Sequence, residues 1–214
     1  MRKLITTTFV TLDGVMQAPG GPDEDREGGF GHGGWSVNYW DDVMGQLIVD
    51  STLRAGALLL GRKTYEIFVA HWPRVSDDDP VAAKLNSVAK SIASRTLDQV
   101  TWNNSTLIQG DVAEAVATLK EQPGAEIQVH GSGELIQTLM EHDLVDEYRL
   151  WVFPVVLGEG KRLFARGAVP AALRLVDTKT SSTGVAIHTY ERAGAIQYGS
   201  FDVAEQGETS KLWT

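Results

Sequence analysis

The chain has 214 residues, no cysteine and a formal net charge of −9 at pH 7. This length suits one domain with at most a short extension, and the lack of cysteine excludes disulfides and thiolate chemistry. The acidic balance argues against a broad nucleic-acid surface and against binding to anionic membranes. No apolar run reaches the roughly 20 residues of a membrane span, and the N-terminus lacks a signal-peptide pattern. We therefore expect a cytoplasmic protein.

The first predicted element is a buried strand over residues 4–12, which are rich in β-branched side chains. It ends at Asp13 and Gly14, a turn signal. Asp13 either serves that turn or lies at the carboxyl end of a central strand, where open α/β sheets bind ligands. On the second interpretation it is a candidate catalytic acid or orienting group. A dry pocket would raise the pKa of its carboxyl group.

Residues 15–36 form a long loop with seven glycines, two prolines and a cluster of acids. Loops of this length are usually functional or disordered, so a lid over a site is one interpretation. Trp40, just after the loop, either walls a substrate pocket or fixes the loop to the core. A helix is predicted to begin at Asp41 and Asp42.

A short buried strand over residues 57–60 meets Gly61, Arg62, Lys63 and Thr64, and a helix follows. Helix N-termini favour acids, so two cations are misplaced there unless an anion is bound. The alternative is that both side chains point into solvent. A further helix is predicted over residues 80–88.

A third strand, residues 90–93, ends at Ser94 and Arg95. Hydroxyl and guanidinium groups at a strand end suit a phosphate on a ribose. A short strand is predicted at residues 107–108. Asp111 then caps a helix, with Glu114 completing a capping-box pattern.

The stretch from Glu126 to Tyr148 is the strongest candidate for a ligand site. A strand leads into a turn of Gly131, Ser132 and Gly133, and a helix follows from Glu134. Glycines let a phosphate approach the unpaired amides of the helix N-terminus. The dinucleotide-binding motif has a third glycine at the position that Ile136 occupies here. An ordinary strand-to-helix turn therefore remains an alternative.

A strand over residues 147–156 precedes two alternating segments, 173–178 and 185–190, which are typical of an antiparallel pair. The whole pattern predicts an α/β fold: a mostly parallel mixed sheet with helices on both faces and a C-terminal antiparallel pair. We expect one domain over residues 1–192 and a polar tail over residues 193–214. The five histidines show no metal-ligand spacing, so no metal site is predicted.

Six stretches carry a resemblance to a known family. They are FVTLDG (9–14), LLLGRKTYE (58–66), KSIASRTL (90–97), VHGSGELIQ (129–137), LVDEYRLWVFPVVLGEGKRLF (144–164) and the closing strand pair. The chain resembles the dihydrofolate reductase fold and, more narrowly, stand-alone bacterial members of the RibD C-terminal family, the reductase domain of riboflavin biosynthesis.

The resemblance implies an NADPH-dependent reductase that is commonly a homodimer. It would transfer a hydride to a C=N or C=O bond of a small pterin-like or ribosylaminopyrimidine-like substrate. Asp13 would lie at the substrate end. The residues implied in cofactor binding are Gly61, Arg62, Thr64, Ser94, Arg95, Gly131, Ser132, Gly133 and Glu134.

The sequence departs from its relatives in two respects. The zinc-binding deaminase domain of the riboflavin enzyme has no counterpart here, and no clear basic set exists for a substrate phosphate, although Lys161 and Arg162 would serve. The lack of a clear proton donor favours an alternative: a nucleotide- or pterin-binding protein that retains the fold without catalysis. A structural dimer with an unused cleft is a third possibility.

Overall fold

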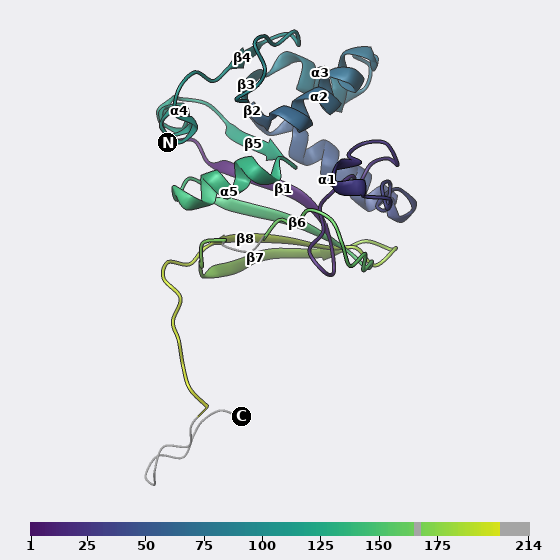
Figure 1. Ribbon diagram of the computed structural model, residues 1–214, viewed down its shortest axis with the longest axis vertical. Helices are drawn as coiled ribbons and strands as arrows, with labels where there is room; N and C mark the ends of the chain where they lie inside the picture. Colours follow the sequence, from purple (N-terminus) through teal and green to yellow (C-terminus); the bar gives the residue numbers. More distant parts are fainter. Residues whose placement is uncertain (165–167, 202–214) are drawn as a thin grey trace.

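The structure, a computed structural model, describes residues 1–164 and 168–201. Its centre is one eight-stranded sheet with the order β4-β3-β2-β5-β1-β6-β8-β7 (Figure 1). β1 to β6 pair in parallel, and β8 runs antiparallel to β6 and β7. The predicted mixed sheet is confirmed. The strands are β1 Leu4–Thr11, β2 Ala55–Gly61, β3 Ala89–Ala93, β4 Ser105–Leu107, β5 Glu126–His130, β6 Glu147–Phe153, β7 Leu173–Thr180 and β8 Ala186–Arg192.

Helices cover both faces of the sheet, as predicted (Figure 1). The α-helices are α1 Asp42–Leu53, α2 Arg62–His71, α3 Pro80–Ser87, α4 Val112–Glu121 and α5 Gly133–Glu141. Three short 3-10 turns accompany them: η1 Glu27–Gly29, η2 Val37–Tyr39 and η3 Trp72–Arg74. None of the described helices is both long and apolar enough to span a membrane.

Side chains alternate between the two faces of the sheet along the central strand β1, so β1 contributes to a core on each face. Leu4 and Val10 of β1 pack in one core with α4 and α5, whereas Phe9 packs on the other side against the core that includes α1. A third core joins β2 and β3 to α2 and α3. Because both faces are covered, the parallel strands present their carboxyl ends, and not their faces, to ligands.

The first and sixth strands end earlier than predicted. The first strand ends at Thr11, and Leu12 lies outside it with 65% of its surface exposed. The sixth strand ends at Phe153 because Pro154, which follows, has no amide for the sheet. Within the predicted tail, residues 193–201 form no helix or strand and extend away from the sheet (Figure 1). Residues 202–214 lie outside the described part, so the division at residue 192 stays a prediction.

Candidate functional site

The N-termini of α2 and α5 lie together at the carboxyl edge of the sheet. β2 leads directly into α2, and β5 leads through the glycine turn into α5. Because β2 and β5 are neighbouring parallel strands, the helices that follow them begin next to each other. Ligands of open α/β sheets bind at this edge.

The Ser132 hydroxyl joins the two turns. Its Oγ accepts a hydrogen bond from the Gly61 N–H at 3.0 Å and lies 2.9 Å from Thr64 Oγ1 and 3.0 Å from the His130 carbonyl oxygen. The Ser132 N–H donates to Thr64 Oγ1 at 3.2 Å. Three residues predicted to bind cofactor, Gly61, Thr64 and Ser132, are therefore in direct contact.

The glycine turn has a left-handed backbone. Gly131 and Ser132 both have φ of 53°, a region that glycine enters freely and serine only when its surroundings hold it there. Gly133 matters for a different reason, since a Cβ on it would lie 2.8 Å from Met16 Sδ. Met16 of the long loop thus covers the glycine turn.

Neither α2 nor α5 has a side-chain cap at its N-terminus. By contrast, α1, α3 and α4 begin with aspartates whose carboxylates accept first-turn amides: Asp41, Asp79 and Asp111. Uncapped amides at the positive end of a helix dipole form an anion-binding surface. The starts of α2 and α5 therefore leave first-turn amides without a side-chain acceptor.

The predicted cations lie at the margin of this surface. Arg62 Nη1 is 3.2 Å from Glu66, four residues on, and both side chains are more than 40% exposed. Such exposed pairs are weak, so Arg62 is free to change partner. Glu134, in the first turn of α5, is exposed.

Ser94 and Arg95 follow the third strand at the same edge. Gly61 pairs with Ala93 in the sheet register, so Ser94 follows its strand just as Arg62, the first residue of α2, follows the neighbouring strand. The Ser94 Oγ accepts the backbone amides of Thr96 and Leu97 at 3.1 and 3.0 Å. Arg95 is exposed and makes no side-chain hydrogen bond or ion pair with any described residue.

Asp13 fastens β1 to the loop that follows β6. Its Oδ1 accepts hydrogen bonds from the Thr11 hydroxyl at 2.6 Å and the Leu157 N–H at 3.2 Å. Its Oδ2 accepts the Gly158 N–H at 2.8 Å, with Arg162 Nη2 at 3.4 Å. The Thr11 hydroxyl above all, with the backbone donors, lowers the pKa of Asp13 well below its usual range. The expected raised pKa was wrong, and the carboxylate is ionised.

Trp40 stands at the edge of an aromatic cluster. Its ring centroid lies 5.8 Å from that of Phe9 and 6.0 Å from that of Trp151, and 39% of the residue is exposed. The neighbours hold the indole in place while one side remains open to solvent. This geometry fits a pocket wall, and it also fixes the end of the loop to the core.

His130, at the end of β5, is a neutral base. Burial chiefly, and then the positive charge of Arg149, lower its pKa to about 4. Its Nε2 lies 3.1 Å from Gln128 Oε1, although the residue keeps some exposed surface. The ring therefore carries no positive charge at pH 7.

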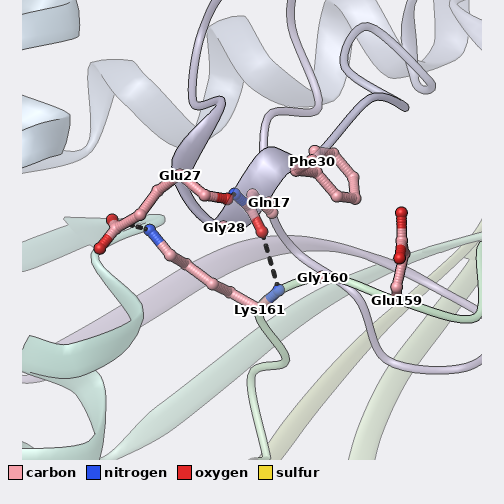
Figure 2. Close-up of a pocket in the computed structure, with 7 residues that line it drawn as sticks. All are labelled: Gln17, Glu27, Gly28, Phe30, Glu159, Gly160 and Lys161. Carbon is pink, nitrogen blue, oxygen red and sulfur yellow. Dashed lines mark hydrogen bonds and ion pairs between the residues drawn. The ribbon is translucent and has the colours of Figure 1, made fainter.

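The long loop is folded against the core at both ends. Val15, Ala18, Phe30 and Trp35 are buried, and Trp35 Nε1 donates to the Gln17 carbonyl at 2.7 Å. Two of its central acids, Asp25 and Glu27, contact Lys63 in the first turn of α2. A hollow of about 280 Å³, lined by Gln17, Glu27, Gly28, Phe30, Glu159, Gly160 and Lys161, opens on one side of them (Figure 2).

The sequence of this chain is similar to that of a known protein family. The model of the RibD C-terminal domain matches residues 2–187. The chain belongs to the RibD C-terminal domain family. It is 33% identical over 198 residues to YyaP of Bacillus subtilis (strain 168), covering 90% of this chain and 96% of that protein.

Solved structures share the fold. A putative riboflavin biosynthesis protein from Shewanella sp. PV-4 superposes with a TM-score of 0.67 at 21% identity, covering 89% of this chain and 98% of the other. Dihydrofolate reductase from Enterococcus faecalis, complexed with NADP(H), gives a TM-score of 0.55 at 16% identity, with coverages of 89% and 96%. The fold is therefore dihydrofolate reductase-like, as predicted.

Sequence reasoning missed what holds the loop to the site. Lys63 was noted as misplaced, and the acids at 23–27 as a cluster, but no pattern paired them. The one available signal was the opposite charge of the two stretches. Met16, which covers Gly133, carries no sequence signal of that role.

Proposed function

We propose that the protein is an NADPH-dependent reductase that transfers a hydride to a C=N or C=O bond of a small pterin-like or ribosylaminopyrimidine-like substrate. The observation that carries this proposal is the pair of uncapped helix N-termini joined by Ser132, because two sets of unpaired amides suit the phosphates of a dinucleotide. Family membership supports the same reaction class.

The residues at the carboxyl edge fit this cofactor. The glycine turn, with Gly131, Ser132, Gly133 and Glu134, would hold the pyrophosphate together with the first turn of α2. Ser94 and Arg95 would meet the adenosine 2′-phosphate, because a free guanidinium at a strand end matches a phosphate dianion. The nicotinamide supplies the hydride, and the protein binds and orients the reactants.

At the substrate end, Trp40 would form a wall against a flat ring. Asp13 acts as an orienting group on this proposal, since its ionised carboxylate and its four donors fix the turn after β1 against residues 157–158. Substitution of Asp13 by Asn would weaken that junction and lower turnover. If Asp13→Asn turned over substrate as fast as the wild type, the assignment of Asp13 would be wrong, but the cofactor assignment would stand.

Binding of NADPH, followed by nicotinamide fluorescence, tests the cofactor assignment. The Arg62→Ala variant should raise the Kd about three- to tenfold, since a charge-assisted phosphate contact is worth roughly 1 kcal/mol at an exposed site. Arg174→Ala is the matched control, because Arg174 pairs with Glu191 on the far antiparallel strands. No binding at high micromolar NADPH would contradict the proposal.

A second candidate is a protein that binds a nucleotide or pterin without turning it over. Asp13 is ionised and His130 is neutral at pH 7, so neither is a strong proton donor. Tight NADPH binding without oxidation, across pterins, ribosylaminopyrimidines and small carbonyl compounds, would favour this candidate. We also expect the protein to be a cytoplasmic homodimer. Light scattering of the purified protein, which measures its molar mass, tests the dimer.

A further inference from the structure

Two acids of the long loop hold a lysine in the first turn of α2. Lys63 Nζ lies 3.1 Å from Asp25 Oδ1 and also contacts Glu27 Oε2. Lys161 Nζ lies 2.7 Å from Asp25 Oδ2 and 2.7 Å from Glu27 Oε2 (Figure 2 shows the contact with Glu27). Each acid therefore bridges both lysines, and residues distant in sequence form one closed set of charges.

Both acids are ionised in this arrangement. Hydrogen bonds from Lys161 and Lys63 lower the pKa of Glu27 to about 2. Burial alone would raise the pKa of Asp25, but hydrogen bonds from Lys161, the Glu27 amide and Lys63 lower it overall. Two negative charges thus contact the ammonium group of a lysine in the first turn of α2, a helix end that favours anions.

The same loop contacts residues at the starts of both α2 and α5. Glu27 lines the hollow of about 280 Å³ and also a second one of about 400 Å³, which Lys63, Glu66 and Ile67 line from α2. Its side chain therefore separates two open volumes. Upstream in the loop, Met16 lies over Gly133 of the second turn. Cover by the loop thus extends to both helix N-termini.

We propose that Asp25 and Glu27 are an internal latch: they hold Lys63 in place of a ligand phosphate, and a phosphate-bearing ligand at the start of α2 must displace them. This proposal rests on the proposed function in that a phosphate binds there. Lys63 and Lys161 are each 41% exposed in these pairs, and exposed ion pairs are individually weak. A phosphate that gains both Lys63 and the free amides can therefore replace the carboxylates.

Charge-neutral substitutions test the latch. Glu27→Gln, alone and with Asp25→Asn, should lower the Kd for NADPH about fivefold at low salt, as expected for the loss of weak competing ion pairs. Asp23→Asn is the matched control, since it removes one charge from the same loop but pairs with Arg26. It should change the Kd less than twofold. Hydrogen exchange of residues 20–29 should accelerate in Glu27→Gln and, in the wild type, on addition of NADPH.

Inorganic pyrophosphate, titrated by calorimetry, separates this proposal from the cofactor assignment. If NADPH binds the wild type and both latch variants equally, with unchanged exchange, the latch is wrong and the cofactor assignment stands. If pyrophosphate alone binds, and binds Glu27→Gln more tightly, the latch stands without NADPH. Failure of both ligands to bind any variant overturns both proposals.

Discussion

The helices of this protein begin in two different ways. α1, α3 and α4 start at an aspartate whose carboxylate accepts first-turn amides, whereas α2 and α5 start at Gly61 and Ser132 without a side-chain cap. An Asp cap satisfies the amides internally and stabilises the helix by about 1 kcal/mol. The two helices that forgo this stabilisation are the two joined by Ser132. On the proposed function, the capped helix ends stabilise the fold and the two uncapped ends bind the cofactor.

Giving α2 a cap should abolish that distinction. Gly61 has φ of −73°, and a Cβ there would meet Ser132 only at ordinary contact distance, so the position accepts an L-residue. Gly61→Asp should stabilise the helix but place a carboxylate on the amides, which weakens NADPH binding at least tenfold, or about 1.4 kcal/mol. Fluorescence titration measures this effect. Gly61→Ala is the control, and equal affinity of the two variants would contradict the comparison.

Removing the cap from α3 should lower stability without changing NADPH affinity. The Asp79 carboxylate accepts the amides of Val81 and Ala82 at 2.8 and 3.0 Å. Asp79→Ala should lower the free energy of unfolding by about 1 kcal/mol and leave the Kd for NADPH unchanged. Urea denaturation and the same titration measure the two quantities. If Asp79→Ala lost NADPH affinity but kept the stability of the wild type, the distinction between the two classes of helix end would be wrong.

The capped ends should also be sensitive to acid. The Met44 amide, with help from Ser182, lowers the pKa of Asp41 below its ordinary value in the folded protein. A lowered folded pKa contributes stability above the unfolded pKa and loses it as pH falls through the folded value. Thermal unfolding of Asp41→Asn between pH 6 and 3 should therefore show a shallower acid limb than the wild type. Parallel curves for the two proteins would mean that ionisation of Asp41 does not contribute to the pH dependence of stability.

Local pattern predicted most of the fold. The buried run at 57–60 lies within β2, and Asp111 caps α4 through the Glu114 amide as predicted. These features depend on neighbours within one turn or strand, which sequence spacing encodes. The two turns predicted to bind cofactor also converge, because β2 and β5 are neighbouring parallel strands whose carboxyl ends lie at the same edge of the sheet.

Long-range contacts explain what the sequence did not predict. Asp13 was expected to lie in a dry pocket, but amides 144 and 145 residues away solvate it instead. The pairing of Glu27 with Lys63 and Lys161 spans 36 and 134 residues. No periodicity encodes such pairs, since they depend on how the loop after β1 lies against two other segments. Side-chain charge states at the site were for this reason the least predictable feature.

The bond between Gly61 and Ser132 also sets when during synthesis the site can exist. It joins residues 71 positions apart, and β5, the strand that brings them together, is made after four others. On the proposed function, a nascent chain that has emerged only as far as β4 would have one half of the surface and could not bind the dinucleotide. If only the state with both turns paired binds NADPH, as the proposed function requires, the cofactor would stabilise that state by mass action late in translation.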